Sequence, residues 1–507
     1  MVPRRWGPMA QIDRSLTKHA GVERTEGAGI MRDGSRGRFA GRGACARRLA
    51  AGLSFVLALG VAWVAAPATA AGGGSQLWTS RYGGTFFNLA HAIATDPDGS
   101  TVFVAGTGYL RWPDYDFVTI AYDARTGALR WMDRYDGPAG AEDYVDSLVV
   151  SPDGSTVFVS GTSYGRGSDD MATIAYRAST GVRMWVSRHG PVRVQDFARG
   201  LAVSPDGSRV FVTGTTERIA TRSDAVTVAY RASTGRELWA NRYRAPDDSS
   251  DGAQSLAVSP DGEAVYVSVL SAGVGGERSH ALLAYDAATG APRWTRRDAG
   301  SLRFTEGTPL GIAASPDGSV IFVSGTAEGR DRGTDFGTVA YDAGSGARVW
   351  ARRYVGPPRA YDYANAFAVS PDGSTVFVTG QTSSGPSTGA YGTVAYRTDT
   401  GATVWSRRYD GTADKYASAN AIAVTSDGTR VYVTGESMGR GTAGDYATVA
   451  YRAGTGAKLW SARYDGPASG WDLALAVAVS PNGARVFVTG GSEYGGVEFF
   501  VTVAYRG

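Results

Sequence analysis

Short runs of alternating hydrophobic and polar residues recur along residues 76–507, and each run ends at Gly, Pro, Asp, Asn or Ser. Alternation with a period of two predicts β-strands, and turn residues at regular spacing predict hairpins between them. In the clearest stretch, 364–411, four such runs follow one another. The pattern therefore predicts a repeating unit of four short strands.

The unit occurs eight times, and each copy carries a Ser-Pro-Asp-Gly turn or a close variant of it. Proline presets φ, aspartate bonds nearby backbone and glycine adopts positive φ, so this tetrapeptide fits a tight turn. The turn aspartates, or the asparagine of the last copy, lie 53 to 56 residues apart, at Asp98, Asp153, Asp206, Asp261, Asp317, Asp372, Asp427 and Asn482. We predict an all-β fold, an eight-bladed β-propeller with four-stranded antiparallel blades.

The two ends of the repeat region suggest how the ring closes. One tryptophan marks the fourth strand of each copy, but the first of them, Trp78, belongs to a strand that precedes copy one. Copy eight stops after its third strand, near Tyr505. We therefore expect the N-terminal strand to supply the outer strand of the last blade, which would remove the free sheet edges.

A leader precedes the repeats. Residues 49–66 are apolar, follow Arg47 and Arg48 and run into Ala68-Thr69-Ala70, a pattern typical of a secretory signal peptide. We predict a leader at 1–70, with Met31 a more ordinary start, a Gly-rich linker at 71–75 and the propeller at 76–507. An uncleaved membrane anchor is the alternative. The expected location is secreted or extracytoplasmic, with association to the cell envelope allowed.

Composition narrows the function classes. The only cysteine, Cys45, lies in the leader, so the exported part has no disulfide. The formal charge of +3 is misleading, since residues 1–48 hold 11 Lys and Arg against 4 Asp and Glu. The remainder is slightly acidic, which argues against nucleic-acid binding. We expect no membrane span after signal cleavage, and a monomer.

The repeat carries a recognisable motif. The stretch 121–131, AYDARTGALRW, resembles the tryptophan-docking motif of the quinoprotein, or pyrroloquinoline quinone-like, propellers, and 445–467 is similar to the bacterial SBBP-type propeller repeats. The resemblance implies either quinone- and calcium-dependent dehydrogenases or non-enzymatic assembly scaffolds. The adjacent-cysteine disulfide typical of the alcohol dehydrogenases is missing, and we identify no inserted segment with a calcium-ligating set. We therefore predict no cofactor and no metal ligand, with pyrroloquinoline quinone and calcium reserved for the enzymatic alternative.

Several residue columns repeat around the predicted ring and are interpreted as framework. Arginine stands three residues after each of the eight tryptophans. Two aspartate columns lie in the loops, one at Asp143, Asp196, Asp251, Asp362 and Asp472, the other at Asp116, Asp170, Asp224, Asp335 and Asp445. Repeated ion pairs and loop capping explain these columns better than catalysis does.

Positions that differ between blades are the candidates for binding, and strand parity places them on the rim that carries the longer loops. A polar column at the mouth of the central channel consists of His91, Asp146, Arg199, Gln254, Asn365 and Asn420. The other interpretation of this column is hydrated channel lining. An aromatic group on the loop rim consists of Trp112, Trp471, Tyr109, Tyr115 and Tyr494, which would suit sugar rings or a protein partner unless the rings pack on their own loops.

No catalytic residue is assigned, because no nucleophile or metal-ligand spacing is present. The sequence favours a secreted, non-catalytic propeller that binds a cell-envelope polymer or protein through its loop rim. A quinone-dependent dehydrogenase is the first alternative. A polysaccharide lyase or glycosidase is the second, and it requires rim carboxylates that converge on a cleft.

Overall fold

Residues 72–507 form 32 β-strands in the part of the chain that the computed structural model describes, and that part contains no helix. The described residues are 72–83, 87–111, 114–165, 167–190, 194–218, 222–246, 250–272, 278–298, 302–305, 310–329, 333–356, 361–385, 388–411, 416–439, 441–467 and 469–507. The predicted signal peptide, Met31 and Trp112 lie outside them. Within these ranges there is no helix of the length and apolarity needed to cross a membrane.

The strands fall into four classes that repeat along the chain. The innermost strands are β2 (Asn88–Thr95), β6 (Asp143–Val150), β10 (Val194–Val203), β14 (Ser250–Val258), β18 (Leu310–Ala314), β22 (Tyr361–Val369), β26 (Ala417–Val424) and β30 (Asp472–Val479). The second strands are β3 (Thr101–Arg111), β7 (Thr156–Tyr164), β11 (Arg209–Arg218), β15 (Ala264–Ala272), β19 (Val320–Glu328), β23 (Thr375–Gly385), β27 (Arg430–Met438) and β31 (Arg485–Tyr494). The third strands are β4 (Asp114–Asp123), β8 (Asp169–Arg177), β12 (Asp224–Arg231), β16 (Arg278–Asp286), β20 (Thr334–Asp342), β24 (Thr388–Arg397), β28 (Gly444–Arg452) and β32 (Val497–Arg506). The outer strands are β5 (Leu129–Tyr135), β9 (Arg183–His189), β13 (Glu237–Tyr243), β17 (Pro292–Asp298), β21 (Arg348–Tyr354), β25 (Thr403–Tyr409), β29 (Lys458–Tyr464) and β1 (Gln76–Tyr82).

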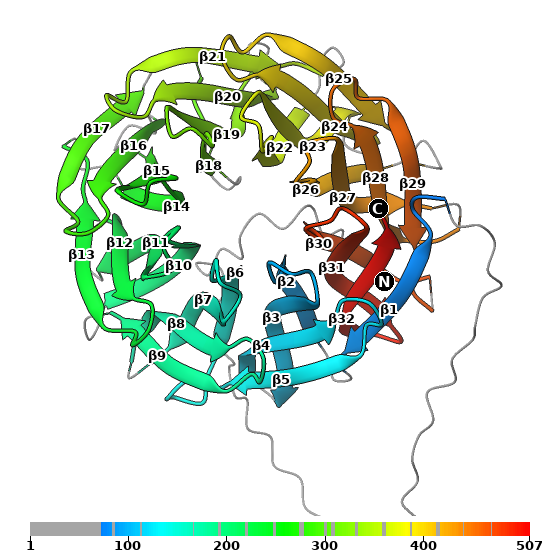
Figure 1. Cartoon of the computed structure of the whole chain (residues 1–507), viewed down its shortest axis with the longest axis horizontal. Coiled ribbons are helices and arrows are strands. Elements are labelled where there is room, and N and C mark those ends of the chain that lie inside the picture. Colours follow the sequence, from blue (N-terminus) through cyan, green and yellow to red (C-terminus); the bar gives the residue numbers. More distant parts are fainter. Residues whose placement is uncertain are drawn as a thin grey trace, which may run out of the picture. The chain divides into compact units, whose positions relative to one another are not determined.

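Each group of four strands pairs in antiparallel order from innermost to outer, and the groups are arranged as blades around a centre that the innermost strands face (Figure 1). Hydrogen bonding gives six sheets of four strands and one of eight. The eight-stranded sheet contains two such groups, β18–β21 and β22–β25, which a single parallel pair, Thr334 with Tyr361, joins. We number the blades one to eight from β2.

The first strand of the chain completes the last sheet. β1 pairs antiparallel with β32, with Trp78 opposite Ala504. Residues 72–75 of the predicted linker belong to the same unit as the strands, and the Gly74 N–H donates a hydrogen bond of 2.8 Å to the Arg506 carbonyl. The Trp78 indole N–H then reaches blade one, where it donates to the Ala124 carbonyl at 3.1 Å. The last blade therefore packs on the first.

The predicted turns have the expected conformation. In the first hairpins the glycines have φ between 66° and 74°, at Gly99, Gly154, Gly207, Gly262, Gly318, Gly373, Gly428 and Gly483. Within one of these turns, an Asp153 carboxylate oxygen accepts the Ser155 N–H at 3.0 Å. Such turns depend on residues that are adjacent in sequence, which explains why the pattern alone predicted them.

The blades are joined by tryptophan docking and by apolar side chains between neighbouring sheets. Seven framework tryptophans donate the indole N–H to a carbonyl of the next blade at 2.6 to 3.1 Å: Trp78, Trp131, Trp185, Trp239, Trp294, Trp350 and Trp405. Between blades one and two, Phe103 and Phe117 pack with Val157 and Val159. Burial of this apolar surface, repeated around the ring, holds the scaffold rigid.

Candidate functional site

The loop rim is defined by chain direction. Because strands alternate in direction, each third strand begins, each outer strand ends and the next innermost strand begins at the same rim. The opposite rim carries only the tight first and third hairpins. Residues just before or after those rim positions therefore lie together, whichever blade they come from.

The predicted channel-mouth residues occupy an unexpected backbone feature. In seven innermost strands the register with the second strand shifts by one residue, and the extra residue of the bulge is the one in this column. Six of the seven are the predicted polar residues, all half-buried: His91, Asp146, Arg199, Gln254, Asn365 and Asn420.

Two of these side chains tie blades together. The Asn365 amide donates to the Ala419 carbonyl at 2.7 Å, and the Asn420 amide donates to the Ala474 carbonyl at 2.9 Å. Each bond therefore runs to the innermost strand of the next blade. Burial lowers the pKa of His91 to about 4. This column thus has a packing role at Asn365 and Asn420, while binding by its members stays a prediction.

The predicted rim aromatics divide into exposed and packed rings. Trp471 is 37% exposed and Tyr494 is 52% exposed. They lie near one another on blade eight, because the Trp471 carbonyl accepts the Glu493 N–H at 2.8 Å. Tyr109 is only 7% exposed, so its ring is not available as predicted; it packs against Tyr115, with ring centroids 5.3 Å apart.

Tyr115 sits at the centre of an aromatic cluster on blade one. Its ring packs edge-on against Phe87, with centroids 5.8 Å apart, and stacks on Tyr144 of blade two, with centroids 5.5 Å apart. Burial raises the pKa of Tyr115, and the carboxylates of Glu142 and Glu498 raise it further. Since Glu498 belongs to β32 of blade eight, Tyr115 lies within electrostatic range of that blade. We call Tyr115, Tyr144, Trp471 and Tyr494 the rim sector.

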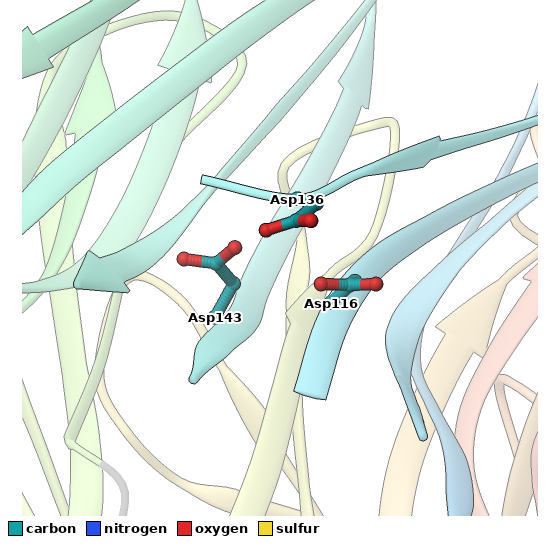
Figure 2. Close-up of side chains that lie close together, drawn as sticks. All are labelled: Asp116, Asp136 and Asp143. Carbon is teal, nitrogen blue, oxygen red and sulfur yellow. The ribbon is translucent and has the colours of Figure 1, made fainter. Parts of the chain in front are cut away.

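Two acidic clusters lie at this rim. The first contains Asp116, Asp136 and Asp143 at the junction of blades one and two, and Figure 2 shows the three side chains brought together from three separate segments. The second contains Asp445, Asp465 and Asp472 at the junction of blades seven and eight. In each cluster one oxygen from each aspartate lies within 4.8 Å of the others.

Ion pairs and a backbone hydrogen bond hold the carboxylates of the clusters in place. Asp116 forms an ion pair with Arg134, and Asp445 forms the equivalent pair with Arg463. The Gly137 N–H donates to Asp143 at 2.5 Å. These are the capping and ion-pair roles predicted for the two aspartate columns and the arginine column.

Several carboxylate oxygens are nevertheless left over. The Oδ1 atoms of Asp116 and Asp445 are buried and have no hydrogen-bond partner. Burial raises the pKa of Asp143 to about 6, an effect that its neighbours Ser163 and Gly137 reduce and Asp136 increases. Burial also raises the pKa of Asp472 to about 6. Each cluster thus contains two buried carboxylates whose negative charge water stabilises poorly.

Two members of each cluster belong to the aspartate columns predicted to be framework, and the third member was not predicted. Asp136 and Asp465 follow the framework arginine by two residues, in the sequence Arg-Tyr-Asp-Gly-Pro. Only at these two junctions do all three acidic positions coincide in the described part of the chain. The three acidic positions can be recognised in the sequence, but only the packing of neighbouring blades shows that their side chains meet.

The clusters do not fit the glycosidase alternative. Its catalytic carboxylates must be reached by a sugar, yet Asp116 and Asp143 are fully buried, and only Asp136 of the first cluster is exposed. The second cluster has the same arrangement, with Asp465 as its exposed member. These carboxylates are placed to interact with each other rather than with a glycosidic bond.

A cavity of about 290 Å³ lies beside the innermost strands of blades four to six. Its lining is Ser255, Gly311, Ile312, Ser324, Ala364, Asn365, Ala366 and Phe367. Pyrroloquinoline quinone is a tricarboxylate and requires cationic partners. None of these lining residues is charged, so the cavity does not fit the quinone.

Residues 64–334 and 335–498 match the model of a family described as outer membrane protein assembly factor BamB, whose units are pyrroloquinoline quinone-like repeats. The match covers most of the chain. Among curated proteins no sequence is significantly similar to it.

Solved structures share the fold at low sequence identity. A quinohemoprotein alcohol dehydrogenase from Pseudomonas putida is 15% identical with a TM-score of 0.57, and the match covers 85% of this chain and 76% of that one. A europium-containing methanol dehydrogenase is 14% identical with a TM-score of 0.54, over 85% and 93% of the two chains. Sqt1 of Chaetomium thermophilum, bound to the N-terminus of a ribosomal protein, is 14% identical with a TM-score of 0.55, over 84% and 98%. Enzymes and binding proteins thus share this architecture, which shows the fold alone.

Proposed function

The chain belongs to the family described as outer membrane protein assembly factor BamB, and from this premise we propose that it is a secreted, non-catalytic propeller that binds a cell-envelope polymer or protein through its loop rim. The family description names an assembly factor for outer membrane proteins, which supports a role at the envelope. The fold neighbour Sqt1 holds a protein N-terminus, which supports binding as a use of this architecture.

The observation that carries the proposal is the exposure of Trp471 and Tyr494 together at the rim of blade eight. Large aromatic side chains on a rigid scaffold bury much surface at little entropic cost, and they are enriched in binding hot spots. Tyr115 and Tyr144, stacked on each other at blades one and two, add two half-buried rings to this rim.

The test is co-sedimentation of the purified protein with insoluble peptidoglycan, and capture of envelope proteins on the immobilised protein. We expect the double variant W471A/Y494A to bind at least about tenfold more weakly, since a hot-spot pair contributes more than about 1.4 kcal/mol. The matched control is L129A, because Leu129 is an apolar residue that is even more exposed, at 62%, and lies at the opposite rim where β5 begins. Equal binding by W471A/Y494A and wild type would contradict the rim assignment.

Quinone-dependent oxidation is the second candidate, supported by the fold similarity to the Pseudomonas putida alcohol dehydrogenase. It predicts saturable quenching of tryptophan fluorescence by pyrroloquinoline quinone in the presence of calcium, and dye reduction with alcohols or sugars. The binding proposal predicts neither.

A further inference from the structure

We propose that the two acidic clusters are calcium sites, one at the junction of blades one and two and one at the junction of blades seven and eight. Each would hold the ion with three aspartate carboxylates from three chain segments: the start of a third strand, the end of its outer strand, and the start of the next blade (Figure 2). The proposal does not depend on what the rim sector binds.

Each cluster carries an excess of negative charge. The cluster of Asp116, Asp136 and Asp143 contains three carboxylates beside the guanidinium of Arg134, and the nearby guanidinium of Arg188 is itself paired with Asp170, which leaves two negative charges in excess. The second cluster has the same composition, with Arg463 as its cation. Because two of the three carboxylates are buried, this excess is costly unless a cation compensates it, and a divalent ion matches it.

Each cluster also contains an unused oxygen. The buried carboxylates of Asp116 and Asp445 each use one oxygen for the arginine, and the other, Oδ1, has no hydrogen-bond partner. A buried polar atom without a partner is rare in native proteins and calls for a ligand. Both side chains belong to groups whose oxygens lie within 4.8 Å of each other, a separation that one central ion can bridge.

Other junctions between blades carry different residues at the same positions and can be compared with the two clusters. At the junction of blades three and four, Arg244 stands where Asp136 and Asp465 stand, and its guanidinium pairs with Asp224 at 2.8 Å. At that junction the protein supplies a positive charge of its own. Where aspartate replaces arginine, the charge must come from solution.

The junction of blades six and seven shows the converse. Asp410 keeps the exposed acidic position, but both buried aspartates are replaced, by Ala390 and Ala417. Asp410 then simply pairs with Arg408 at 2.5 Å. The buried pair and the exposed aspartate therefore occur together only at the two proposed sites in the described residues.

The chemistry of the donors selects the ion. All are carboxylate oxygens, which hard cations prefer, and calcium accepts oxygens at about 2.3–2.6 Å in flexible geometry, so two of its ligands can lie up to roughly 5 Å apart. Magnesium demands a tighter octahedron at about 2.0–2.1 Å. The exposed member, Asp136 or Asp465, leaves a path from solvent to each site.

The experiment is calorimetric titration of the chelator-treated, purified protein with calcium chloride, and separately with magnesium chloride. We expect two calcium ions per chain, one lost in each of D136N and D465N and both lost in the double variant, with affinity at a changed site weakened at least about tenfold. The control D410N should still bind two. Both changed aspartates are exposed, so circular dichroism should show an unaltered fold. Calcium binding of wild-type affinity in the double variant, the absence of calcium binding to the wild type, or tighter binding of magnesium would each overturn the proposal.

Discussion

Replacing the docked tryptophan of blade six, Trp405, with phenylalanine tests the energetic role of the repeat motif. The indole N–H donates to the Ala453 carbonyl at 2.6 Å, and the ring packs between Phe377 and Tyr451 at 5.8 and 6.0 Å. Loss of the donor leaves a buried carbonyl without a partner, which costs about 1–3 kcal/mol. The missing ring atoms add about 1 kcal/mol of lost burial. We expect W405F to lower the free energy of unfolding by about 2–4 kcal/mol.

The assay is urea unfolding followed by circular dichroism and by fluorescence, with coincidence of the two curves as the check on two-state behaviour. The matched control is W471F, since Trp471 is half-exposed and donates no such bond to the next blade in the described structure. The control should stay within about 0.5 kcal/mol of wild type. A W405F protein within that same margin would refute the claim that tryptophan docking stabilises the ring.

Three further predictions follow from particular residues. Gly181 has φ of 71°, and a Cβ there would lie 2.6 Å from the Trp131 ring, so G181A should lower the melting temperature by several degrees. The control G454A has open space around it and should leave the melting temperature unchanged. Equal melting temperatures of the two variants would contradict this prediction. Between blades five and six, Val355 stands at the position that the exposed aspartate has in the proposed calcium sites. V355D should therefore add a third calcium ion in the titration. An unchanged stoichiometry would show that three aspartates are not sufficient. Burial and a facing glutamate raise the pKa of Glu498 to about 7, so its contribution to stability is full below about pH 4.5 and is lost as the pH rises through 7. Unfolding measured across that range should show E498Q with a weaker pH dependence than wild type, and identical slopes would contradict the assignment.

The fold was readable from sequence because its signals are local. The period-two runs, the glycines with positive φ and the tryptophan spacing each depend on residues within one repeat. The pairing of β1 with β32 was readable too, since an unmatched first strand and an incomplete last copy leave one economical arrangement.

The site was only partly readable, because it depends on contacts between repeats. The column of His91 was interpreted as a channel mouth, but its residues are bulged, and a bulge is visible only in the register with a partner strand. Tyr109 was grouped with exposed rings, although the neighbouring Tyr115 covers it. Asp136 could not be predicted as a cluster member, because Asp116 and Asp143 come from other segments and approach it only when the blades pack.

Hydrogen–deuterium exchange of the full chain, with and without saturating cell-envelope ligand, tests the central claim most directly, because it maps the bound surface without any substitution. We predict slower exchange in peptides that contain Tyr115, Tyr144, Trp471 and Tyr494, and no change in the Ser-Pro-Asp-Gly hairpins of the opposite rim. Protection confined to those hairpins or to the outer strands would contradict binding through the loop rim.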